Sequence, residues 1–147
     1  MTVLNVAMFG SDELAKDIAK ATDQRDVHTY VHKELRDGKP KIISIIRPAR
    51  YPERLRPLLN AISAGRVGII EINSVDAVLG EVIVSFASSS ITKGIAVIKP
   101  NEEDWIDQEM VEKMFIQAGL NNWTFMQGDG LEIRNQLYKL MEEIDLE

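Results

Sequence analysis

The stretch VAMFGSDELAKDIA, residues 6–19, carries the strongest signal for fold and function in this chain. It predicts a buried strand, a tight turn and the start of a helix. The phosphate loop of nucleotide-binding proteins consists of a glycine, four residues and Gly-Lys-Ser/Thr, and its backbone N–H groups turn toward phosphate oxygens. Gly10 and Lys16 keep this frame. Ala15 replaces the second glycine and Asp17 replaces the hydroxyl that binds magnesium, so the pattern leaves open whether a nucleotide still binds.

Short apolar strands alternate with helical patterns along the rest of the chain. The expected strands are 4–9, 27–32, 41–46, 67–72, 95–98 and 123–126. The expected helices are 12–21, 52–62, 76–86, 107–118 and 131–141. This order predicts an α/β fold of three layers, with a mostly parallel six-stranded sheet between helices on both faces. Residues 27–32 break the alternation and are expected to form one antiparallel edge strand.

The composition is that of an ordinary globular domain. The 147 residues are 45% hydrophobic and 27% charged, which allows one domain over residues 1–145 to bury a core of its own. Residues 146–147 are expected to be a remnant of an expression tag. Cysteine is absent, and the net charge of −6 disfavours a generally nucleic-acid-binding surface. No export signal or membrane span is recognisable, so we expect a cytoplasmic protein that does not associate with membranes.

Four further stretches carry a resemblance to a known family: ISIIRPARY (43–51), ERLRPLLNAISAG (53–65), GIIEINSVDAVLG (68–80) and ITKGIAVI (91–98). Together with residues 6–19 they resemble the GTPase domain of translation elongation factors, in the branch of EF-Tu and the selenocysteine factor. Within this branch, the chain resembles the selenocysteine-factor-like proteins of methanogenic archaea, which are proposed as factors for pyrrolysine. The resemblance implies a P-loop-GTPase-like fold over essentially the whole chain. It also implies GTP or GDP with magnesium as ligands, aminoacyl-tRNA or the ribosome as partners, and β-barrel domains farther along the parent chain.

The residues that carry the family's chemistry are replaced here. Arg47 and Arg50 stand where the resemblance implies a magnesium-holding aspartate and a glycine that senses the γ-phosphate. Tyr51 stands where it implies the histidine that positions water. Residues 99–102, Lys-Pro-Asn-Glu, replace the guanine-reading Asn-Lys-x-Asp motif, in which Glu102 could imitate the aspartate. The resemblance combined with these replacements predicts a domain that has lost GTP hydrolysis, and we predict no catalytic residue.

Two overlapping sets of site residues follow. The candidate nucleotide-binding residues are Gly10, Ser11, Lys16, Asp17 and Glu102. The candidate anion- or RNA-binding residues are Lys16, Arg47, Arg50, Arg54 and Lys99. We also expect Asp17 and Arg47 to form an ion pair that fills the vacant metal position. No metal ligands are predicted, because the two histidines on one face of the expected strand, at 28 and 32, lack an evident third ligand.

The sequence leaves several functions open. The first is a GTPase-like domain that docks to transfer RNA, to the ribosome or to β-barrel domains of its own parent chain. The alternative is an elongation-factor domain that binds GTP or GDP at an atypical site. A dinucleotide binder is a weaker candidate, since residues 10–15 contain only one glycine of that fingerprint. A structural module without any ligand would behave like the first case with an empty anion site.

Overall fold

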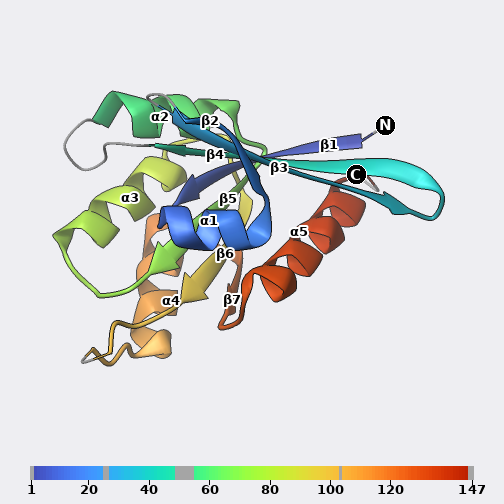
Figure 1. Cartoon of the computed structure of the whole chain (residues 1–147). Coiled ribbons are helices and arrows are strands. Elements are labelled where there is room, and N and C mark those ends of the chain that lie inside the picture. Colours follow the sequence, from blue (N-terminus) through green and yellow to red (C-terminus); the bar gives the residue numbers. More distant parts are fainter. Residues whose placement is uncertain (1, 25–26, 49–54, 103, 146–147) are drawn as a thin grey trace.

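The computed structural model describes residues 2–24, 27–48, 55–102 and 104–145 (Figure 1). The strands are β1 (Thr2–Phe9), β2 (Lys20–Gln24), β3 (Val27–Arg36), β4 (Lys39–Pro48), β5 (Val67–Ile72), β6 (Lys93–Ile98) and β7 (Asn122–Met126). The helices are α1 (Asp12–Ile18), α2 (Leu55–Ala64), α3 (Ala77–Ala87), α4 (Gln108–Ala118) and α5 (Gly130–Asp145). The strands form one sheet in the order β2-β3-β4-β1-β5-β6-β7.

The sheet lies between two helical layers, which confirms the predicted α/β fold of three layers. Helices α1 and α5 pack on one face, and α2, α3 and α4 pack on the other (Figure 1). Strand β5 is buried along its whole length, as expected for a central parallel strand that is covered on both sides. Among the helices of the described residues, none has the length and apolar character needed to cross a bilayer.

The sheet has seven strands rather than the predicted six. The predicted helix 12–21 ends at Ile18, and residues 20–24 form the additional strand β2. Strand β2 pairs with the antiparallel strand β3, so the predicted edge position of residues 27–32 was wrong and β2 is the edge. The sequence of β2, Lys-Ala-Thr-Asp-Gln, lacks the alternation that marks a half-buried strand. Pairing with its neighbour, rather than local pattern, determines its conformation.

A pair of glycines lets a large aromatic side chain pack against the centre of the sheet. Gly68 of β5 and Gly94 of β6 are partners in the parallel register. A Cβ atom on Gly94 would lie 2.6 Å from the Gly68 carbonyl oxygen and 2.8 Å from the ring of Trp123. That ring in turn makes edge contacts with Phe86 at 5.4 Å between centroids. The two glycines are therefore required for close packing in the layer that contains α3 and α4.

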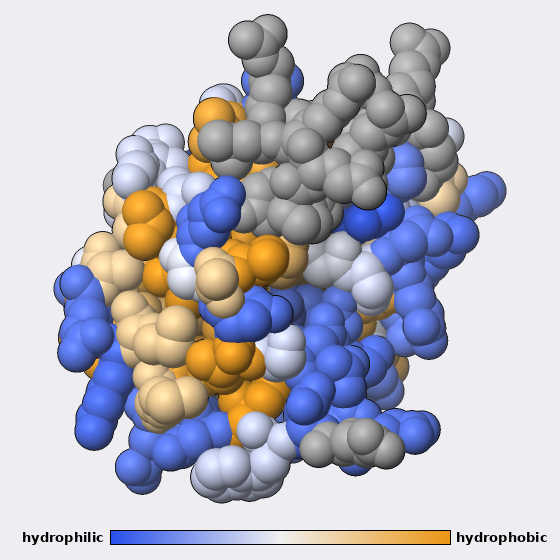
Figure 2. All heavy atoms as spheres, turned by 90° about the vertical axis from the view of Figure 1, so that its left-hand side faces the viewer, coloured by the Kyte–Doolittle hydropathy of each residue, from blue (hydrophilic) through white to orange (hydrophobic). Residues whose placement is uncertain are grey.

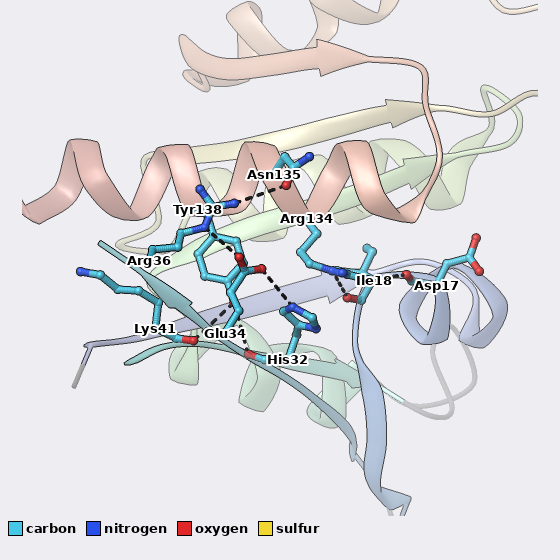
Figure 3. Close-up of polar contacts among 9 residues, drawn as sticks. All are labelled: Asp17, Ile18, His32, Glu34, Arg36, Lys41, Arg134, Asn135 and Tyr138. Atoms are coloured by element: carbon cyan, nitrogen blue, oxygen red, sulfur yellow. Dashed lines mark hydrogen bonds and ion pairs between the residues drawn. The ribbon is translucent and has the colours of Figure 1, made fainter. Parts of the chain in front are cut away.

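Polar contacts connect α5 with the β3–β4 hairpin and with the end of α1 (Figure 3). Arg134 Nε donates to the Ile18 carbonyl at 2.8 Å, and the Arg36 guanidinium lies 4.3 Å from the centre of the Tyr138 ring. The Tyr138 hydroxyl lies 3.5 Å from the carbonyl oxygen of His32, and burial raises the pKa of Tyr138 to about 12. The contacts of Arg134 position the end of α1, the helix that follows the β1–α1 turn.

The topology brings several loops together at the sheet edge that is formed by the carboxyl ends of the parallel strands. Strand β1 lies between β4 and β5, so the direction in which the chain adds strands to the sheet reverses at β1. In open parallel sheets, the crevice beyond the carboxyl ends of strands at such a reversal is the usual ligand position. Gly10 after β1, Asn73 after β5 and Lys99 after β6 all lie at this edge.

Candidate functional site

The connection between β1 and α1 consists of only Gly10 and Ser11. The Ser11 side chain caps α1 by accepting from the Leu14 N–H at 3.1 Å. In the phosphate-loop pattern the lysine follows a wide loop and opens the helix. Here the helix already begins at Asp12, so Lys16 lies one turn inside it. The sequence keeps the frame of a phosphate loop, but the structure replaces the loop with a two-residue turn.

A buried carboxylate faces this turn. Glu71 of β5 is 4% exposed and is the buried charged residue of the described part of the chain. Its Oε1 accepts from the Ser11 backbone N–H at 2.7 Å, and its Oε2 lies 3.4 Å from Asn73 Nδ2. A Cβ atom at Gly10 would lie 2.9 Å from Glu71 Cβ, so the glycine allows this approach. The carboxylate thus bonds a backbone donor of the kind that a phosphate loop offers to phosphate.

Arg47, near the end of β4, connects the turn to β3. Its side chain is 12% exposed. Its guanidinium donates to the Tyr30 hydroxyl at 3.0 Å, to the Gly10 carbonyl at 3.1 Å and to His28 Nδ1 at 2.8 Å. Asp12 Oδ1 lies 3.9 Å from Arg47 Nη2. The Arg47 guanidinium therefore uses its donors on groups within the domain.

The acidic partner of Arg47 is Asp12, which corrects the predicted pair with Asp17. Asp17 is exposed, and within the described residues its carboxylate makes no ion pair with Arg47. Asp12 also accepts from Lys16 at 2.8 Å and from Tyr30 at 2.6 Å. Hydrogen bonds from Lys16 and then Tyr30 lower the pKa of Asp12, whereas burial and then the bond to Asp12 raise the pKa of Tyr30.

A pocket of about 530 Å³ lies beside the turn at the same sheet edge. Its lining consists of Ser11, Glu13, Glu71, Asn73, Lys99, Pro100, Asn101 and Glu102. Asn73 holds the β6–α4 loop in position, because its Nδ2 donates to the Lys99 carbonyl at 2.9 Å and its own carbonyl accepts from Asn101 N–H at 3.2 Å. The lining contains three carboxylates and one ammonium group. Such a site attracts cations more than polyphosphates.

The structure brings together some of the predicted site residues. Ser11, Lys99 and Glu102 line the pocket, with Gly10 next to it. Lys16 is bonded to Asp12, and neither Lys16 nor Asp17 is part of the pocket lining. Arg50, Arg54 and Tyr51 lie outside the described residues.

Sequence reasoning missed Glu71, Tyr30 and Asp12 as members of the site. The one available signal was the glutamate inside the otherwise apolar run Gly-Ile-Ile-Glu-Ile at residues 68–72. A charge at a buried strand position needs a partner, which marks it for attention. Over the described ranges, no group of three or more histidine, aspartate or glutamate side chains is placed to hold a metal ion.

Comparisons with known proteins support the fold. No protein-family model matches the chain. An uncharacterized protein of Methanocaldococcus jannaschii is 25% identical over 146 residues, which are 99% of this chain and 45% of that protein. The crystal structure of a bacterial selenocysteine-specific elongation factor, EF-Sec, superposes with a TM-score of 0.69 at 17% identity, over 97% of this chain and 29% of that one. The chain therefore has an elongation-factor-like fold and spans less than half the length of these two proteins.

Proposed function

We propose that this chain is a GTPase-like domain of a translation-factor-like protein, which docks to a partner without binding or hydrolysing GTP. The observation that carries the proposal is the hydrogen bond of 2.7 Å between the Glu71 carboxylate and the Ser11 N–H. A nucleotide phosphate at this turn would meet a carboxylate that is only 4% exposed and already bonded to the donor. Two negative charges that share one hydrogen-bond donor repel each other strongly in a partly buried site.

The two cations nearest the turn support the same conclusion. Lys16 is bonded to Asp12, and Arg47 uses its guanidinium on Tyr30, Gly10 and His28. A phosphate would have to displace these partners before either cation could bind it. The position that the resemblance assigns to a magnesium-holding aspartate carries Arg47, whose positive charge opposes a metal ion. Loss of hydrolysis follows from the same replacement.

Protein is the partner that these contacts favour. The resemblance implies aminoacyl-tRNA, the ribosome or β-barrel domains of the parent chain. Among the described residues of the predicted RNA-binding set, Lys16 and Arg47 are both bonded within the domain, which leaves Lys99 beside the carboxylates of Glu13 and Glu102. An RNA backbone would be repelled by these groups. The relative from M. jannaschii has more than half of its length outside the matched part, which provides room for further domains in a parent chain of this kind.

The alternative, a GTP-binding domain with an atypical site, has one observation in its favour. The pocket of about 530 Å³ is lined by Ser11, Lys99 and Glu102, three positions at which a guanine nucleotide could make contact. Titration calorimetry with GTP and GDP, with ATP as the control and with or without magnesium, separates the two functions. We expect no binding at millimolar nucleotide. Guanine-selective binding in the micromolar range, weakened in Lys99→Ala and Glu102→Ala, would instead establish the alternative.

A further inference from the structure

The loop between β6 and α4 carries a solvent-exposed tryptophan. Trp105 is 84% exposed, whereas its neighbour Ile106 is buried in the core beneath α3 and α4. Exposed indole rings of this size are uncommon on monomeric proteins, since they leave a large apolar area in water. An isolated exposed apolar residue would need no explanation, so the surroundings of Trp105 decide whether it has a role.

Hydrogen bonds position the described residues of this loop, which are 99–102 and 104–107. The Lys99 N–H donates to the Ile72 carbonyl at 2.9 Å, which continues the strand pairing beyond β6. The Asp104 N–H donates to the Asn101 carbonyl at 2.9 Å, and Asn101 Nδ2 donates to Asp104 Oδ2 at 3.1 Å. Together with the buried Ile106 side chain, these bonds fix the backbone on both sides of Trp105. The indole of Trp105 is therefore exposed between two residues that have defined contacts, Asp104 and Ile106.

Trp105 belongs to a hollow of about 320 Å³ that combines apolar and acidic groups. Its apolar lining is Val75, Trp105 and Met110, and all three are exposed. Its acidic lining is Asp104 and Asp107, the latter being the N-cap of α4. We call these five residues the Trp105 surface. It combines apolar side chains with charged groups, as protein-binding sites do.

The acidic character continues along the sheet edge. Ser74 joins the Trp105 surface to a smaller hollow that contains Asp76 and Glu71, and Glu71 joins that hollow to the pocket with Glu13 and Glu102. Figure 2 views this edge of the molecule, and it shows hydrophobic side chains gathered on one part and hydrophilic ones beside them. An occupant that covers this edge must therefore present apolar and positively charged groups together.

We propose that the Trp105 surface docks a basic protein segment, in which an aliphatic or aromatic side chain packs on the indole while arginine or lysine side chains face Asp104 and Asp107. The proposal deepens, and rests on, the docking function proposed above. Charge complementarity selects this occupant, because the acidic rim repels an RNA backbone. It also disfavours a second copy paired through the same surface, since a two-fold axis would bring the same carboxylates together.

The test uses a fluorescein-labelled amphipathic peptide of leucine and arginine as the probe, with its binding to the whole chain measured by anisotropy. The variants are Trp105→Ala, which removes the apolar centre, and Asp104→Asn/Asp107→Asn, which removes charge while asparagine keeps the helix cap. The matched controls lie elsewhere: Leu35→Ala on the β3–β4 hairpin is an exposed apolar truncation, and Glu142→Gln/Glu143→Gln at the end of α5 removes two exposed carboxylates.

We expect Trp105→Ala to weaken peptide binding about tenfold, as truncation of a central interface tryptophan does. The double asparagine variant should weaken it several-fold, and both controls should bind like the wild type. Equal binding by Trp105→Ala, or equal losses in the controls, would overturn the proposal. Tryptophan-dependent binding of a labelled oligouridylate, or tryptophan-dependent dimerisation in ultracentrifugation, would overturn it in favour of RNA or a second copy. Nucleotide calorimetry tests a different site, the pocket beside Ser11. Binding of GTP there would refute the proposed function, whereas the peptide measurement would still decide whether the Trp105 surface binds a basic segment.

Discussion

Replacing Arg47 by alanine tests whether this residue supports the fold or is available to bind anions. The variant removes three hydrogen bonds, to Tyr30, Gly10 and His28, and a charge 3.9 Å from Asp12. At about 1 kcal/mol for each bond, the expected loss is about 3 kcal/mol in the free energy of unfolding. The ion pair with Asp12 adds no more than about 1 kcal/mol, because the Asp12 side chain is 41% exposed.

The assay is urea denaturation followed by far-ultraviolet circular dichroism. Lys99→Ala is the matched control, because Lys99 is an exposed cation at the same sheet edge and should change stability by no more than about 0.5 kcal/mol. Arg47→Lys should recover only part of the loss, since an ammonium group cannot reproduce the planar set of donors.

The outcome that refutes this reasoning is an Arg47→Ala variant within about 1 kcal/mol of the wild type. Arg47 would then not depend on its contacts within the protein, and its guanidinium would be available to a phosphate or an RNA backbone. That result would restore the predicted anion site and weaken the case for a nucleotide-independent domain.

Three further predictions concern the packing, the pH dependence and the nucleotide motif. Gly94→Ala should lower stability by about 2 kcal/mol or more, since its Cβ would lie 2.6 Å from a backbone oxygen; Gly80→Ala, with no neighbour within 4 Å on its helix, should gain up to about 1 kcal/mol in the same urea assay. Burial raises the pKa of Tyr138 to about 12, so the fold has its full stability below pH 10 and loses up to about 3 kcal/mol as the pH rises from 10 toward 12 and the buried hydroxyl ionises. Denaturation at several alkaline pH values should show a smaller loss in Tyr138→Phe, and equal losses would contradict the assignment. Ala15→Gly/Asp17→Thr restores the phosphate-loop signature but should give no GTP binding by calorimetry, because the helix begins before the restored residues.

The sequence predicts the central part of the fold well, because strand burial there is encoded locally. The expected strand 67–72 coincides with β5, whose six residues are all buried. The expected helix 107–118 is also confirmed as α4, and Gly119 caps its end with a left-handed backbone that suits glycine. Residues 20 and 21 were predicted as the end of the helix 12–21, and residues 22–24 were assigned to no element. Their pairing with β3 is a tertiary interaction, which no local period could reveal.

The site is predictable in position but not in its contacts. The rule that carboxyl ends of parallel strands meet at one edge correctly brings Ser11, Lys99 and Glu102 together. It does not say which side chains bond to one another, and the expected partner of Arg47 was wrong for that reason. Asp12 and Asp17 differ by five residues, so on a helix they face different directions. Only the position of β4 beside β1 decides that Arg47 approaches Asp12.

The residues at the positions that the resemblance assigns to nucleotide binding form one connected set of contacts. Arg47 bonds the carbonyl of Gly10, whose neighbour Ser11 donates to Glu71. Asp12 follows directly and holds Lys16, the lysine of the motif. Restoring one of these residues toward a phosphate loop would therefore leave a partner without its hydrogen bond in a partly buried position, at a cost in stability. These contacts occupy the backbone donor and the cations at the β1–α1 turn, which supports the proposal that this elongation-factor-like fold acts through a different surface.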